Sequence, residues 1–288
     1  MESTAHLNPA SLEIPLQLIN NALAPCTIYT FGHRCQSNNS WNALVAEAGT
    51  SQPTHHACLL VFTNAANPNS ALDLANLVRE QTRGAVTVTL LVHKPADLAT
   101  AQPDQQWFLW SVLRNAQRLC LDKTAIPYWP HTWDPGRDIK AARAYWLKCE
   151  AVAGFHINAA AASEHVDVEL VKIALLHQAA EQIALGLIST FMGYTPNQYS
   201  LQYLLALCSH FTQLPTTVFP QSTRWQQKRF KQLCAPPSML RHWIHLDASE
   251  ADFTYLLDAC TQFLDAAAEL AAAELVRVNQ TPTLNPEP

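Results

Sequence analysis

One segment of the chain has the spacing of a buried helix followed by a clear helix end. Between residues 173 and 187, apolar side chains recur at three- and four-residue intervals, the period of one helix face. Gly193 suits the residue that terminates a helix, and Thr195-Pro196 prevents the helix from restarting there. We therefore expect a core helix over residues 166–192.

Two polar side chains interrupt this apolar helix. His177 and Glu181 are four residues apart, so they share one face. The pair could contribute to a binding site, or it could be a hydrogen-bonded pair inside the core. Buried polar groups are usually hydrogen-bonded, which favours the second interpretation.

The first half of the chain mixes strands and helices. Short apolar or β-branched runs predict strands, and amphipathic segments predict helices. We expect strands at 26–31 (ending at Gly32), 57–63 and 85–93, helices at 15–23, 69–81 and 105–121, a short helix or lengthened loop at 41–47, and a possible short strand near Cys120. This order indicates a small α/β domain over residues 1–126.

The second half is nearly all helix. Three prolines within residues 127–135 oppose helix continuation, so residues 127–137 are expected to connect two domains. Short links between helices are typical of an up-and-down helical bundle, here over residues 138–276, with a flexible tail at 277–288. The expected helices are 138–153, 166–192, 201–211, 223–233 and 250–276.

Composition narrows the functional classes. The net charge is -5, so any nucleic-acid binding needs a local basic patch. None of the eight cysteines forms a CxxC pair, which argues against a zinc knuckle. Most of them lie in apolar runs, so a reduced, cytoplasmic setting is favoured over a disulfide framework. The N-terminus does not have the pattern of a signal peptide, and no apolar run is expected to reach membrane-spanning length.

The helical half resembles the HEPN domain, a helical module of prokaryotic nucleic-acid-associated proteins. The resemblance covers roughly residues 138–274. It rests on Leu-Leu-His-Gln-Ala-Ala-Glu at 175–181, Gly-Tyr-Thr-Pro at 193–196, the helix at 201–207 and a late segment at 230–250. It implies an all-α bundle, commonly paired into a homodimer through this helical domain.

The first half is similar to the nucleotidyltransferase-like domain that often precedes HEPN. The matching segments are 28–34, 59–61 and 86–93. That family places Gly-Ser after the first strand and two acidic residues, spaced by one, on the second. Here His33 follows Gly32, and no Asp or Glu lies between Glu47 and Asp73. Magnesium requires oxygen ligands, usually carboxylates, so we expect an inactive relative without a metal site or cofactor.

The two resemblances imply candidate binding residues. For a nucleotide or nucleic acid these are Gly32, His33, Arg34, His177 and Glu181. His55 and His56 have two interpretations: a soft-metal site with Cys58 or His93, or two loop histidines preceding a buried strand. The second is favoured because no spacing requires a metal.

Ribonucleases of the HEPN type carry Arg, four to six residues, then His on one helix. The nearest match is Arg241, His242 and His245, with three residues between Arg241 and His245. His could act as acid or base, and Arg could stabilise a phosphate transition state. An Arg and two His that pack a helix end are the alternative.

Three functional hypotheses follow. The favoured one is a non-catalytic module that binds a nucleotide, RNA or a protein partner. The others are a metal-independent endoribonuclease that uses Arg241 with His245 or His242, and a purely structural homodimer. No membrane association is expected.

Overall fold

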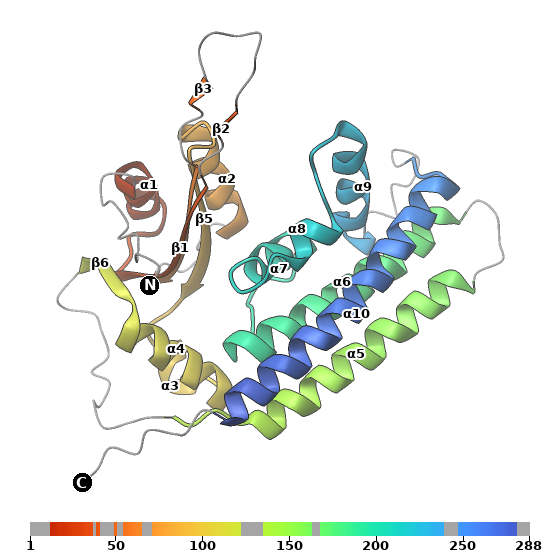
Figure 1. Ribbon diagram of the computed structural model, residues 1–288. Helices are drawn as coiled ribbons and strands as arrows, with labels where there is room; N and C mark the ends of the chain where they lie inside the picture. The colour runs from red at the N-terminus through yellow and green to blue at the C-terminus, as the bar shows by residue number, and fades with distance from the viewer. Residues whose placement is uncertain are drawn as a thin grey trace. The chain divides into compact units, whose positions relative to one another are not determined.

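The computed structural model describes residues 12–36, 39–40, 49–50, 54–64, 71–121, 135–162, 168–238 and 247–280 (Figure 1). The chain divides into two compact units, which are considered separately. The first unit comprises residues 1–102 and 109–135, and the second comprises residues 103–108 and 136–288. An α/β part is thus followed by a helical part.

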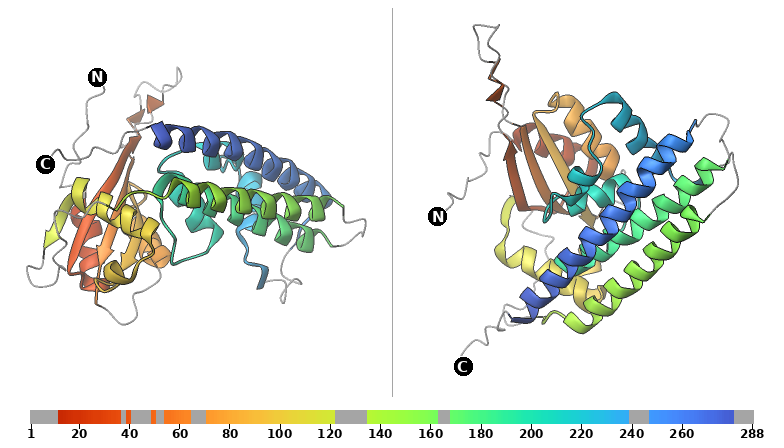
Figure 2. Two further views of the ribbon diagram at one scale, coloured as in Figure 1. Left: turned by 90° about the horizontal axis from the view of Figure 1, so that it is seen from below. Right: turned by 45° about the vertical axis from the view of Figure 1, so that its right-hand side comes forward.

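A four-stranded mixed sheet forms the first unit, in the order β5-β4-β1-β6 (Figure 2). Strand β1 is antiparallel to β4 and to β6, whereas β4 is parallel to β5. The strands are β1 (Thr27–Gln36), β4 (Thr54–Phe62), β5 (Val86–His93) and β6 (Gln117–Leu121), and two-residue strands β2 (Asn39–Ser40) and β3 (Gly49–Thr50) pair separately.

Strands β4 and β5 are apolar along most of their length because both of their faces are buried. One face forms a core with α1 (Glu13–Leu23) and α2 (Ala71–Gln81). On β4, Leu59 and Val61 belong to this core, and Leu60 on the opposite face is also buried. The first unit also contains α3 (Asp97–Thr100), and α4 (Pro103–Asn115) passes from the second unit into the first.

Three long helices form the body of the second unit: α5 (Ile139–Ala161), α6 (Glu169–Met192) and α10 (Glu250–Gln280). Helix α5 is antiparallel to α6, since Arg137 before α5 donates a hydrogen bond to Ser189 near the end of α6. Helix α10 instead runs parallel to α6, because Lys172 lies against Phe253 and the Cys260 thiol contacts the Leu176 carbonyl. The bundle is therefore not simply up-and-down.

Three short helices reverse the chain between α6 and α10, which permits the parallel arrangement. They are α7 (Leu201–Cys208), α8 (Leu214–Val218) and α9 (Arg224–Cys234). Thr223 and Gln226 form a capping box at the start of α9, and Ser200 caps α7. Gly193 ends α6 with a left-handed φ of 59°, as its position predicts.

Several expected boundaries are wrong. Strand β1 continues through Gly32, with a register shift between Thr30 and Gly32. Strand β4 begins at Thr54, so His55 and His56 lie on a strand and are not in a loop. Helix α5 continues to Ala161, and α10 extends into the expected tail, to Gln280. Residues 41–47 and most of the expected connector lie outside the described residues.

The expectation that no apolar run reaches membrane-spanning length is wrong for helix α6. Among the described residues it is the one helix long and apolar enough to cross a membrane by length and composition, but 67% of its apolar stretch is buried. Core helices of soluble proteins have the same character. The structure is therefore compatible with a soluble protein.

Candidate functional site

One histidine and the arginine of the expected binding set, His33 and Arg34, meet His55 and His56 at one end of the sheet. In the β1–β4 ladder, Arg34 is opposite His56, and Cys35 is opposite His55. Because successive strand residues point to opposite faces, Arg34 and His56 share one face, while His33, Cys35 and His55 share the other. We call this region, defined by His33, Arg34, His55 and His56, the histidine end.

His33 and His55 form a direct contact on their face of the sheet. Nε2 of His33 is 3.2 Å from Nδ1 of His55, and the rings are stacked with centroids 5.4 Å apart. One nitrogen must carry the hydrogen and the other must accept it. Burial, and secondly the proximity of His55, lower the pKa of His33. His33 is therefore more easily kept neutral than a free imidazole.

His56 is held by two threonines of β5 on the other face. Its Nδ1 is 2.7 Å from the Thr87 hydroxyl oxygen, and its Nε2 is 3.2 Å from that of Thr89. Burial, followed by the positive charge of Arg34, lowers the pKa of His56 to about 4. His56 is therefore neutral at pH 7, and both of its ring nitrogens already have hydroxyl partners.

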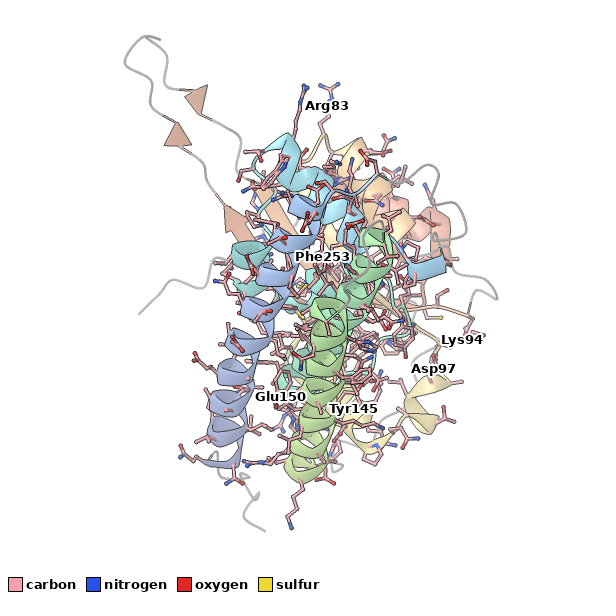
Figure 3. All side chains as sticks on the ribbon, turned by 90° about the vertical axis from the view of Figure 1, so that its right-hand side faces the viewer. Arg83, Lys94, Asp97, Tyr145, Glu150 and Phe253 are labelled. Atoms are coloured by element: carbon pink, nitrogen blue, oxygen red, sulfur yellow. The ribbon has the colours of Figure 1, made fainter. Side chains whose placement is uncertain are left out.

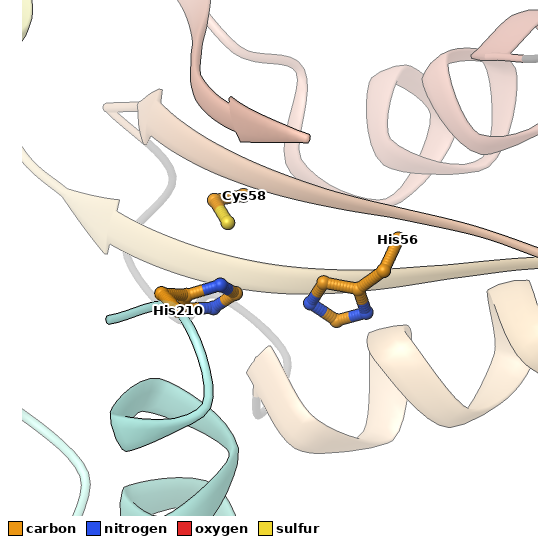
Figure 4. Close-up of side chains that lie close together, drawn as sticks. All are labelled: His56, Cys58 and His210. Atoms are coloured by element: carbon orange, nitrogen blue, oxygen red, sulfur yellow. The ribbon is translucent and has the colours of Figure 1, made fainter. Parts of the chain in front are cut away.

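Gly32 and Cys58 are cross-strand neighbours, and their contact explains the glycine. A Cβ atom at position 32 would lie 2.8 Å from the Cys58 sulfur, so only glycine fits without a shift. Burial raises the pKa of Cys58 to about 12, although the charge of Arg34 acts in the opposite direction. Cys58, which follows His56 on β4 (Figure 4), is therefore a protonated, buried thiol.

Among the described residues, Arg34 and two arginines of the neighbouring turn bring positive charge to the histidine end. Strand β5 enters this end from the turn after α2, where the His55 amide donates to the Ala85 carbonyl. Arg79 and Arg83 flank that turn and are exposed, together with Glu80 (Figure 3 labels Arg83). None of the described strands β1, β4, β5 and β6 carries Asp or Glu. A pair of strand carboxylates for magnesium is therefore missing from these strands.

His177 and Glu181 belong to the second unit, where His177 joins two helices. The side chain is buried, and Nδ1 donates to the Leu233 carbonyl at 2.8 Å, near the end of α9. Its Nε2 is 3.7 Å from a carboxylate oxygen of Glu181, which is partly exposed. The observed contacts of His177 connect α6 with α9. They place it inside a helical core.

The ribonuclease candidates Arg241, His242 and His245 lie outside the described residues, so that prediction stays a prediction.

The threonine partners of His56 were missed by sequence reasoning. Their signal was available in the Val-Thr-Val-Thr alternation at 86–89, which places Thr87 and Thr89 on one face. The register that pairs them with His56 becomes evident only in the structure.

A second surface of interest runs along α5 and α10, which lie side by side in the view of Figure 3. A shallow groove of about 370 Å³ with two cations, Lys140 and Arg143, is further lined by Ile139, Ala144, Leu147 and Asn279. The middle of α10 presents Asp258, Asp265 and Glu269 instead. Positive and negative charges are thus separated along one helix pair.

Compared with models of known protein families and with curated protein sequences, the chain matches none.

Proposed function

We propose that this protein is a non-catalytic binding protein whose histidine end holds a phosphate-bearing ligand, a nucleotide or RNA. The supporting observation is that Arg34 and His56 share one face of β1 and β4, which carry no carboxylates, at the end of the sheet where His33 and His55 lie on the other face. The resemblance to a nucleotidyltransferase-like domain preceding a HEPN domain agrees with this class of ligand. Cytoplasmic localisation is part of the same proposal.

Arg34 is the principal phosphate-binding group in this proposal. A guanidinium offers planar, paired donors that match two phosphate oxygens. The positive charge of Arg34 helps to lower the pKa of His56 and opposes the rise in the pKa of Cys58. Arg34 therefore acts on the face of the sheet where Gly32 contacts Cys58. Arg79 and Arg83 add positive charge at the turn beside His55. A local basic region can thereby attract an anion to a chain with a net charge of -5.

Several features favour binding without turnover. Transfer of a nucleotidyl group needs metal ions to neutralise the charge on the phosphates, and the described strands provide no carboxylates for them. His56 is a poor general base because its pKa is lowered to about 4 and its nitrogens contact threonines. Cys58 is a poor nucleophile because its thiol stays protonated.

Equilibrium binding combined with product analysis tests this proposal. The full chain is titrated with fluorescent nucleoside triphosphates and short single-stranded RNAs, with and without magnesium. We expect saturable binding that weakens as salt increases, with ligand recovered intact. Absence of binding to both ligand classes contradicts the binding proposal. Rapid conversion of ligand contradicts its non-catalytic part.

The charge separation on α5 and α10 supports a second proposal, that two copies pair through this face. Gly154 of α5 lies near Leu264 of α10, and Ile139 and Asn279 line the same groove, so the two helices are adjacent at both places. The basic groove at the start of α5 and the acidic residues of α10 are offset along the pair. A twofold arrangement would place each basic groove opposite the partner's acidic side. Exposed Leu147 and Phe155 supply apolar surface.

Sedimentation of charge-reversal variants tests the pairing. Arg143→Glu should shift the chain toward monomer, and adding Asp265→Lys should restore dimer because opposite charges again face each other. Lys148→Glu is the matched control, since Lys148 is exposed on α5 but does not line the groove. A monomeric wild-type chain at micromolar concentration contradicts this second proposal.

A further inference from the structure

We propose that His33, Cys35 and His55 form a binding site for a zinc ion at the tip of the β1–β4 pair. This site goes beyond the proposed phosphate binding and lies on the opposite face from Arg34 and His56. Two imidazoles and one thiolate are ligands that zinc accepts, leaving a fourth position for water.

The two histidine nitrogens already have suitable spacing. Nε2 of His33 and Nδ1 of His55 are 3.2 Å apart. Two nitrogens bound to one tetrahedral zinc ion at about 2.0–2.1 Å are roughly 3.3 Å from each other. An ion between the two nitrogens would replace the hydrogen that they share, and the stacked rings would turn so that both lone pairs face it.

Cys35 supplies the third ligand through strand register. It is two residues from His33 on β1 and directly opposite His55 on β4, so all three side chains share one face. Directly opposed residues have Cβ atoms about 4.5–5.5 Å apart. Cys35 is exposed and is a free cysteine, so rotation about χ1 can bring its sulfur toward the ion without disturbing the core.

Zinc binds the lone pair of a neutral imidazole and the thiolate form of cysteine, so binding requires that these groups carry no proton at the ligating atoms. The Cys35 thiol loses its proton to solvent when the sulfur binds zinc, so coordination releases one proton and requires no oxidant or reductant.

The neighbouring His56 and Cys58 serve as internal comparisons. They alternate with the proposed ligands along β4 and point to the other face. Both nitrogens of His56 contact threonine hydroxyls, and Cys58 is buried. Substitutions at these two positions therefore distinguish the proposed site from any other site on the same strand.

Zinc titration of the reduced, chelator-treated full chain tests the site, with a chromophoric chelator as competitor and cobalt(II) as a spectroscopic probe. We expect one tightly bound ion and a thiolate-to-cobalt absorption band. Cys35→Ser should abolish the band and weaken zinc binding by at least about 10–100-fold, and His55→Gln should weaken binding similarly. His56→Gln should leave both signals unchanged.

Other outcomes overturn the zinc site. These are binding only at millimolar zinc, a band that persists in Cys35→Ser, or a band lost instead in Cys58→Ser. The phosphate proposal is separable from this one. Arg34→Gln should retain zinc while losing anion binding, and Cys35→Ser should lose zinc while retaining anion binding. Circular dichroism of each variant confirms that it is folded.

Discussion

Arg229 and Asp252 form a buried ion pair that fixes α9 to the first turn of α10. Nε of Arg229 donates to a carboxylate oxygen of Asp252 at 2.7 Å, and each side chain is 4% exposed. Burial alone would raise the pKa of Asp252, but hydrogen bonds from Arg229 and Ser249 outweigh it and hold that pKa well below its usual range. The carboxylate is therefore charged at neutral pH.

Removing one member of this pair should strongly destabilise the helical unit. We expect Arg229→Ala to lower the free energy of unfolding by about 3–5 kcal/mol, because Asp252 would remain buried without its main partner. Urea unfolding followed by circular dichroism measures the change. Lys228 lies 3.4 Å from the same carboxylate but is 50% exposed. Lys228→Ala should therefore cost less than about 1 kcal/mol, and equal losses for both variants would contradict this account.

Two helical glycines should respond to alanine in opposite directions. A Cβ on Gly186 would lie 2.8 Å from the Trp146 ring and 3.0 Å from the Cys149 Cβ, so α5 and α6 would have to separate. We expect Gly186→Ala to destabilise by about 1–3 kcal/mol. The Cβ of Gly154→Ala meets only Leu264, at 3.9 Å, and should stabilise by about 0.5–1 kcal/mol. Thermal unfolding of the wild type and of both variants measures the two changes in stability.

Substitution of His177 should lower the stability of the protein and leave its ligand affinity unchanged. His177→Ala removes the donor to the Leu233 carbonyl, which leaves a buried acceptor unpaired at a cost of about 1–3 kcal/mol. Glu181→Gln is the control, since its carboxylate is 3.7 Å from the ring and should contribute less than about 1 kcal/mol. Nucleotide affinity that falls with His177→Ala in a fully folded protein would restore His177 as a site residue.

The first unit should lose stability as the pH falls below the usual pKa of histidine. Burial lowers the pKa of His93, while the carboxylate of Asp97 acts in the opposite direction. The unfolded chain therefore takes up the proton first, so stability is full above about pH 6.5 and declines as the pH falls toward the folded-state pKa. Unfolding measured at about pH 7 and about pH 5 should show this loss.

Two substitutions should change this pH dependence in opposite directions. His93→Gln should make the loss shallower because it removes one of the histidines whose pKa is lowered in this unit, the others being His33 and His56. Asp97→Asn should make it steeper, since the nearby carboxylate that raises the His93 pKa is gone. Identical pH profiles for the wild type and both variants would exclude His93 as the cause.

Apolar periodicity predicted the buried elements well. The core helix expected at 166–192 is observed as Glu169–Met192, and the apolar strand expected at 85–93 is observed as Val86–His93. Both elements are determined by side chains that must be removed from water, so their pattern is visible in the sequence. The left-handed end of α6 at Gly193 was predictable for a related reason, because glycine adopts that conformation without strain.

Elements that depend on partners were not predictable in this way. His55 and His56 extend β4 through backbone hydrogen bonds to neighbouring strands, which polar side chains do not indicate. The second half of α5 is rich in alanine and lacks a strong apolar stripe. The candidate site was only partly predictable for the same reason. The sequence indicated Gly32, His33 and Arg34, but their proximity to His55 and His56 depends on the register of β1 against β4.

The most direct test of the central claim compares two arginines of the same sheet. Arg34 lies at the histidine end of β1, whereas Arg118 is exposed on β6, opposite Tyr29. Binding of a nucleoside triphosphate or a short RNA should weaken at least about tenfold in Arg34→Gln, equivalent to about 1.4 kcal/mol, and stay unchanged in Arg118→Gln. Equal affinities for the wild type and both variants would contradict a phosphate-binding site at the histidine end.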